Sequence, residues 1–298
     1  MDTSDTPIVN TLDMEILLHR DCHFSSLFDE MITYYKKESV GTMPDFDVEE
    51  IEKLFTLEQK LGKDLSSIYL NEASYEIIRS CKDMYARLRD IYDSPSPDPQ
   101  KVLISDLILS EEEYPEKTIA AILLEKELML PLLFPLLSSS HFYSPLYPGY
   151  GRVPALAATI LGKIQDSSAI PHLFNAMVED NFFTDDAIIL ALVSFGDQTL
   201  DFLLPKLKGK PFSNDNERAA IVLSSFPETD AIGKICLQLL EKTETLSRPM
   251  FSSYLIFSCG ALKGKAYQDR FKALSHKPGL SLELKQDIKI IVKNFQKP

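Results

Sequence analysis

The chain has 298 residues, of which 45% are hydrophobic and 25% are charged, a balance typical of a folded globular protein. Its 31 basic and 44 acidic side chains give a net charge of -13, which argues against a general nucleic-acid binder, because such proteins gain most of their affinity by neutralising phosphates. The four cysteines have no clustered spacing, which argues against a scaffold built on disulfides.

The start of the chain is polar and acidic, without the positive region and apolar core of a secretory signal. The most apolar run, residues 128–137, contains two prolines and is shorter than the roughly 20 residues needed to cross a bilayer. We therefore predict a cytoplasmic protein with no membrane partner. A specialised secretion signal made only of Ser- and Thr-rich sequence would not be recognisable here, so export by such a route remains an alternative.

The first third of the chain carries three stretches with helical spacing of apolar residues, 11–37, 48–61 and about 71–92. The first could instead be two short helices that restart near Ser26. Gly62 is expected to end the second stretch. These lengths and short connections predict an acidic antiparallel helical bundle over residues 1–93.

The clearest linker signal is the segment 94–99, which holds three prolines in six residues. Proline cannot continue a helix interior and favours extended backbone in the residue before it. We predict a domain boundary there, with the flanking helices still free to pack on each other. After it, short apolar segments at 100–109, 115–126 and 128–138 alternate with turns.

A repeat begins after residue 150. A shift of 34 residues places Gly162 on Gly196 and Pro171 on Pro205, and two further apolar segments end at Pro227 and Gly260. A fixed period in this range is the signature of a solenoid, in which stacked helix pairs bury the apolar stripes that one pair cannot bury alone. The four residues are predicted to end the first helix of successive pairs. The alternative is a helical domain with coincidental spacing.

The segment 158–171, Ala-Thr-Ile-Leu-Gly-Lys-Ile-Gln-Asp-Ser-Ser-Ala-Ile-Pro, resembles the core of the short bacterial HEAT repeats of phycobilin-lyase-like proteins. The resemblance covers about residues 100–295 and is strong over 153–207, whereas Pro227 replaces the glycine in a later copy. The segment that starts at Tyr114 also looks like the opening unit of an uncharacterised bacterial family. The resemblance implies an all-α fold, in which the bundle precedes a HEAT-like α-α solenoid at residues 100–298, and it implies no activity.

Signals for catalysis and for cofactors are weak. Glu15, His19 and His23 have the i, i+4, i+8 spacing of one helix face, next to Cys22. A metal site in a bundle also needs ligands from a facing helix, and the Glu-x-x-His pairs of di-metal bundles are absent. We interpret these residues as a stripe of polar side chains on the protein surface, and we predict no catalytic residue, no cofactor and no metal ligand.

Charge is distributed unevenly along the chain. Residues 1–150 carry 28 acidic and 13 basic side chains, whereas residues 206–298 carry 9 acidic and 16 basic ones. This asymmetry indicates either ordinary solvated faces or self-association between the acidic N-terminal half and the basic C-terminal third. Nucleic acid as a partner would require the basic third to act alone.

Two sets of residues are candidates for binding a protein partner. The first set lies at expected exposed positions of the second helices. The second lies in the loop 138–151, where tyrosines on a proline-stiffened segment suit an interface, or alternatively fold back over the chain. The candidates are His172, Asn175, Lys206 and Lys234 on the helices, and Tyr143, Tyr147 and Tyr150 in the loop.

The leading hypothesis is a non-enzymatic scaffold or adaptor that grips an unnamed protein partner with the concave face of the solenoid. The first alternative is an enzyme, with a lyase-like or metal-dependent activity in the N-terminal bundle. The second is nucleic-acid binding by the basic C-terminal third.

Overall fold

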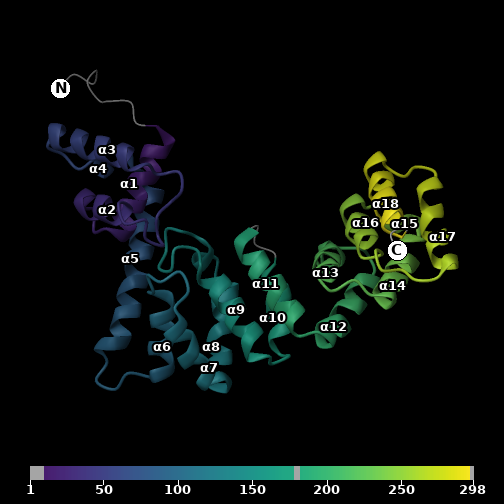
Figure 1. The fold of residues 1–298 in the computed structure, drawn as a ribbon. Helices are drawn as coiled ribbons and strands as arrows, with labels where there is room; N and C mark the ends of the chain where they lie inside the picture. Colours follow the sequence, from purple (N-terminus) through teal and green to yellow (C-terminus); the bar gives the residue numbers. More distant parts are fainter. Residues whose placement is uncertain (1–9, 178–181, 296–298) are drawn as a thin grey trace. The chain divides into compact units, whose positions relative to one another are not determined.

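The computed structural model describes residues 10–177 and 182–295 of the chain, with the side chains of 182 and 183 left aside. The protein is 71% helical, and the described residues contain no strand (Figure 1). The predicted all-α fold is therefore confirmed. The chain divides into two compact units, Met1–Ile164 and Gln165–Pro298.

The first two helices of unit 1 show how local signals place a helix. The side chain of Asn10 accepts a hydrogen bond from the Asp13 backbone, and the Asp13 side chain accepts one from the Asn10 backbone, which is a capping box. Ser25 and Ser26 take positive φ angles of 52° and 63°. The stretch 11–37 is therefore two helices, α1 (Thr11–His23) and α2 (Phe28–Tyr35).

The next helices pack against α1 and complete a hydrophobic core with it. Helix α3 (Val48–Leu61) ends at Gly62, whose φ of 59° is left-handed, as predicted. Helix α4 (Ser66–Tyr69) is short, and α5 (Glu72–Asp93) begins at Asn71, whose side chain accepts from the Ser74 backbone. The core residues include Ile16, Leu17, Met31, Ile51 and Leu65, all fully buried.

The proline-rich segment 94–99 lies between two helices that pack on each other within unit 1. Helix α5 ends at Asp93, and α6 (Pro99–Ile108) begins with Pro99 after an Asp98 cap. The division between the units follows Ile164 instead. The rest of unit 1 comprises α7 (Glu116–Leu124), α8 (Lys126–Ser138), η1 (Ser140–Tyr143) and α9 (Val153–Ile164).

The loop after α8 returns to the N-terminal helices. Tyr147 is buried in a cluster with Cys22 of α1 and with Ile78 and Cys81 of α5. Residues far along the sequence thus complete the interior between α1 and α5, which ties the first helices to the segment between α8 and α9.

Unit 2 is a run of short helices in which α13 packs on α12 and α16, and α16 packs in turn on α14 and α18. Figure 1 shows α18 beside α16 in this part of the chain. The helices are α10 (Ala169–Ala176), α11 (Phe182–Ser194), α12 (Asp197–Lys208), α13 (Asn214–Ser224), α14 (Asp230–Leu240), α15 (Thr243–Leu246), α16 (Pro249–Phe257), α17 (Lys265–Ala273), η2 (Leu274–His276) and α18 (Leu282–Asn294).

The predicted helix ends are mostly right and wrong at one position. Gly196, with a φ of 59°, separates α11 from α12, while Pro227 and Gly260 follow α13 and α16. Gly162 lies inside α9, which continues to Ile164 before Gln165 turns the chain at a φ of 61°. Burial of Ile164 offsets the modest cost of an internal glycine, about 1 kcal/mol.

Candidate functional site

A polar network within unit 1 is centred on His23. Its Nε2 lies 2.9 Å from the carbonyl oxygen of Pro145, and its Nδ1 lies 2.8 Å from the Tyr85 hydroxyl. A carbonyl only accepts, so Nε2 carries the proton, and in the neutral ring Nδ1 accepts from the Tyr85 hydroxyl. The network joins α1, α5 and the loop before α9.

The electrostatics of this network favour neutral groups. Burial lowers the pKa of His23 to about 4, although the bond to Pro145 favours the charged form. Burial also raises the pKa of Tyr85 and of Tyr150, whose hydroxyls interact with each other. At neutral pH the imidazole and both phenols are therefore uncharged, and the network holds the fold by hydrogen bonds.

Unusual backbone geometry converges on Tyr150. Its φ is 55°, between Gly149 at 88° and Gly151 at 77°, and non-glycine residues rarely take this conformation. A Cβ on Gly41 would lie 2.5 Å from the Tyr150 ring, so only glycine leaves room there. Strained backbone persists only where the surroundings hold it, which the aromatic packing around Tyr150 does.

The interpretation of Glu15, His19 and His23 as a polar stripe on the surface is wrong. Glu15 is exposed, whereas His19 is buried against the rings of Phe24, Tyr35 and Phe46. Burial, together with the nearby His23, lowers the pKa of His19 to about 3. Among the described residues, no group of three or more His, Cys, Asp or Glu side chains could hold a metal ion.

Two polar cavities lie along α5. One, of about 450 Å³, is lined by His23, Tyr85 and Tyr150 and by the cations Lys82 and Arg89.

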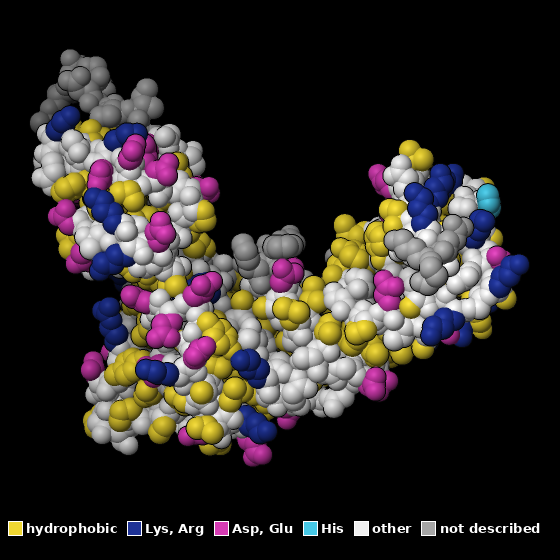
Figure 2. Space-filling view, viewed as in Figure 1, with side chains coloured by type: hydrophobic (Ala, Val, Ile, Leu, Met, Phe, Trp, Pro, Cys, Tyr) yellow, Lys and Arg dark blue, Asp and Glu magenta, His cyan; other side chains and the backbone are white. Residues whose placement is uncertain are grey.

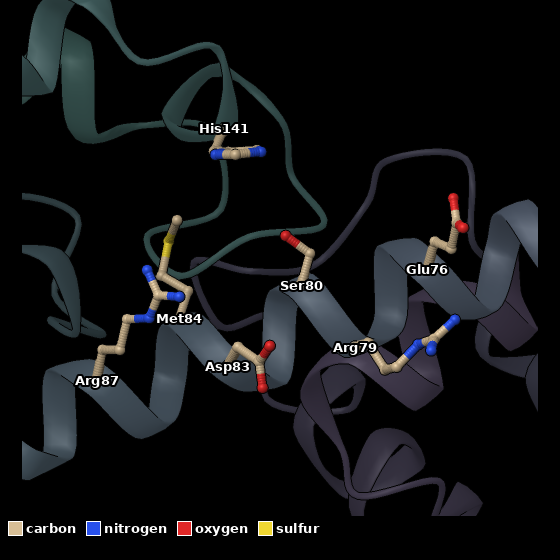
Figure 3. A pocket seen from close by; sticks show the side chains of 7 residues that line it. All are labelled: Glu76, Arg79, Ser80, Asp83, Met84, Arg87 and His141. Carbon is tan, nitrogen blue, oxygen red and sulfur yellow. The ribbon is translucent and has the colours of Figure 1, made fainter.

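The other cavity, of about 470 Å³, lies between α5 and the loop that carries His141. Figure 3 shows Ser80 and Met84 on the side of α5 toward His141, while Glu76 lies further along the helix. His141 is exposed and its ring packs 4.4 Å from that of Tyr147. Neither cavity along α5 joins a nucleophile to a base in the arrangement that covalent catalysis requires.

All four cysteines are buried. The Cys81 thiol donates to the Cys22 backbone carbonyl at 3.5 Å, and that of Cys259 donates to the Leu255 carbonyl at 3.3 Å. The adjacent Cys81 thiol and burial raise the pKa of Cys22, and burial raises that of Cys259, so both remain protonated thiols.

The three tyrosines of the loop 138–151 differ in exposure. Tyr147 is 8% exposed, while Tyr143 and Tyr150 are half-buried. The Tyr143 hydroxyl donates to the Leu137 carbonyl at 2.8 Å. The loop therefore folds back on unit 1, and its part in partner binding stays a prediction.

The candidate residues of the second helices fall into two groups. His172 and Asn175 are exposed on α10. Lys206 on α12 pairs with Asp215 at 3.0 Å, and Lys234 on α14 pairs with Asp230 at 2.6 Å.

The two lysines also stabilise the unit itself. Lys206 lies 4.7 Å from the Phe174 ring centre, and Lys234 lies 4.7 Å from that of Tyr267. Their hydrogen bonds lower the pKa of Asp215 and of Asp230. Much of the charge of both lysines is therefore already balanced within the chain.

The most apolar of the cavities described here is a groove in unit 2, of about 630 Å³, between α12 and the start of α14. Sequence reasoning assigned the apolar positions of the second helices to the interior and so missed it. Ile170 is buried as expected, but Leu204, its counterpart one repeat later, is half-buried and lines the groove. The lining is Gly196, Asp197, Leu200, Asp201, Leu204, Leu223, Phe226, Pro227, Thr229, Ala231, Ile232 and Ile235.

Within the described residues, no single helix has the length and apolar character to span a bilayer. Two consecutive helices, residues 184–194 and 197–208, are long and apolar enough only when taken together, and the chain bends by 113° between them. No protein-family model matches the chain, and neither a curated protein nor a solved structure matches it.

Proposed function

We propose that the protein is a non-enzymatic binding module, a scaffold or adaptor of HEAT-like construction, that seats a partner helix in the groove between α12 and α14. The observation that carries the proposal is the groove itself, because it offers apolar side chains to solvent between two helices that both rest on other helices. Its volume is within the range of ligand sites, about 300–1,000 Å³.

The groove side chains suit an amphipathic helix. Leu200 and Leu204 are one turn apart on α12, and Ala231 and Ile235 are one turn apart on α14. Two facing apolar rows accept residues spaced by three and four, the anchors of helix-in-groove recognition. The buried side chains of Phe226 and Leu223 also line the groove.

The charge along the groove indicates which kind of amphipathic helix would bind. Asp197 and Asp201 are exposed along the groove, and neither forms an ion pair with a described residue. A partner helix with Lys or Arg beside its apolar stripe would complement them, whereas an acidic helix would be repelled. We therefore expect a basic amphipathic segment as the ligand.

A peptide-display selection on the full-length protein tests this proposal, with a library of amphipathic helical peptides. Enriched peptides are expected to carry apolar residues at three- and four-residue spacing together with Lys or Arg. The groove variant L200D/I235D should weaken their binding at least about tenfold. The control L190D places one such aspartate on α11, at a leucine that is 70% exposed, and should bind normally.

Peptides that bind the groove variant as tightly as the unaltered protein would place binding elsewhere. A selection that enriches no peptide, or only acidic ones, would also contradict the proposal. Circular dichroism at 222 nm establishes that the variants keep their helical content.

A further inference from the structure

The last helix presents a row of lysines. Lys285, Lys289 and Lys293 are four residues apart on α18, so they share one face. The opposite face of α18 is buried through Leu284 and Ile288. None of the three lysines forms an ion pair with a described residue, and Lys289 and Lys293 are exposed. We call these three residues the lysine stripe.

The surroundings of the lysine stripe are also basic. Residues 263–295 carry eight basic and three acidic side chains. Figure 2 shows Lys and Arg side chains gathered over the part of unit 2 formed by α17 and α18. Arg270 is paired with Glu241 at 2.7 Å, but the basic side chains of this segment still outnumber its acidic ones.

Unit 1 carries a surface of opposite charge. Glu111, Glu112 and Glu113 lie between α6 and α7, and Glu116 is the first residue of α7; all four are exposed. None forms an ion pair with a described residue. We call these four residues the acidic loop.

The backbone of the acidic loop is held in place. The Arg152 guanidinium donates to the carbonyl of Glu112 at 3.0 Å and to that of Ser110 at 2.9 Å. Arg152 thus fixes the main chain of the loop and leaves the carboxylates in solvent. A charged surface on a fixed backbone loses less entropy on binding than a flexible one does.

We propose that the lysine stripe of one chain binds the acidic loop of a second copy. Three lysines on a helix face three or four carboxylates on a fixed loop, and both surfaces are present in every chain at equal concentration. The net charge of -13 opposes approach to nucleic acid. The contact joins unlike surfaces, so association proceeds head to tail into rings or short filaments.

Sedimentation velocity of the full-length protein tests the proposal at low ionic strength, about 50 mM, and at high ionic strength, about 500 mM, where exposed charges are screened. We expect oligomers at low salt and monomers at high salt. The loop variant E111K/E112K/E113K and the stripe variant K285E/K289E/K293E should each be monomeric at low salt, with self-association weakened at least tenfold.

An equimolar mixture of the two variants provides the sharpest test. The stripe of the loop variant remains positive and meets the acidic loop of the stripe variant, while the two reversed surfaces also attract each other. The mixture should therefore regain the oligomers that neither variant forms alone. The control K37E/K60E/K63E makes the same charge change at exposed lysines of unit 1 and should associate normally.

Several results would overturn the proposal. They are a protein that is monomeric at low salt, variants that still associate alone, and a mixture that does not regain oligomers. A monomer whose sedimentation coefficient changes with salt and with either variant would assign the contact to one chain instead of two. A shift with duplex DNA that the stripe variant abolishes, without self-association, would assign the lysine stripe to nucleic acid.

Discussion

The Tyr85 hydroxyl donates a hydrogen bond to Nδ1 of His23 across 2.8 Å, while the other nitrogen of the same ring donates to the Pro145 carbonyl. The imidazole is therefore fixed in one tautomer by partners from two other parts of the chain. Protonation of Nδ1 would remove its acceptor and place a charge in a half-buried site.

This relationship predicts a loss of stability in mild acid. In the unfolded chain the pKa of His23 is 6.5, whereas in the folded protein it is about 4. The stability that neutral His23 contributes is therefore fully present above pH 6.5. It is lost as the pH falls toward 4, because the unfolded chain then binds more protons than the folded protein does. The loss is about 2 kcal/mol between pH 7 and pH 5. His19 adds a contribution of the same sign, with a folded pKa of about 3. Urea denaturation at pH 7 and at pH 5 measures this loss of unfolding free energy.

The variant His23→Gln separates this effect from the titration of carboxylates. Glutamine can donate to the Pro145 carbonyl and does not titrate, so its stability should vary less between pH 7 and pH 5. A pH dependence equal to that of the unaltered protein would show that His23 is not the group responsible.

A buried arginine should be the most sensitive charged position in unit 1. The fully buried Arg20 bonds to Asp21, Glu58 and Asp64, each at 2.8 Å, and lies 4.4 Å from the Phe28 ring centre. Removal of the cation leaves Asp21 buried without its partner. Arg20→Ala should therefore cost about 3–5 kcal/mol of unfolding free energy in urea denaturation.

The matched control for Arg20 is Arg79→Ala, which removes an exposed ion pair with Glu72. Exposed pairs contribute about 0–1 kcal/mol, so this variant should unfold almost like the unaltered protein. Similar losses in the two variants would mean that the Arg20 network contributes no more than a surface pair.

Gly41 and Tyr150 should be energetically coupled. A methyl group at Gly41 would lie 2.5 Å from the Tyr150 ring and displace it, which we expect to cost about 1–3 kcal/mol. In a Tyr150→Ala background the same Gly41→Ala change should cost little, because the ring is gone. A double-mutant cycle of unfolding free energies measures the coupling, and additive costs would contradict the close approach.

Two glycines of unit 2 should respond differently to alanine. A Cβ at Gly233 meets the buried Leu262 side chain at 2.9 Å, whereas at Gly260 it meets the exposed carboxylate of Glu228, which can move away. Thermal unfolding should show a loss of about 1–3 kcal/mol for Gly233→Ala and a change within about 0.5 kcal/mol for Gly260→Ala. The reverse order would contradict the packing of α14 on the segment after α16.

The positions of helices could be predicted where an apolar helical repeat was followed by a residue that ends a helix. Gly62 ends α3 with left-handed backbone, and Gly196, whose φ is also positive, separates α11 from α12, as expected from their positions after apolar stripes. Gly162 has the same sequence context, yet the helix continues through it. The difference comes from Ile164, whose burial depends on tertiary packing that the local sequence does not show.

The sites were less predictable than the helices. The partners of His23 lie 62 and 122 residues away along the chain, and no local pattern links them. The groove residues follow the ordinary apolar spacing of a second helix, so the exposure of Leu204 is visible only in three dimensions. The four-residue spacing of Lys285, Lys289 and Lys293, by contrast, can be read directly from the sequence.

Because Tyr147 packs between α1 and α5, the core between these two helices cannot be completed until the ribosome has added Tyr147. Cys22 and Cys81 leave the ribosome well before Pro145, Tyr147 and Tyr150 have been added. At about 5–20 residues per second, the nascent N-terminal helices wait several seconds with part of their apolar surface uncovered. A chaperone that shelters exposed side chains would be most useful to this protein during that interval, and a ribosome stalled near residue 100 would carry an incomplete N-terminal half.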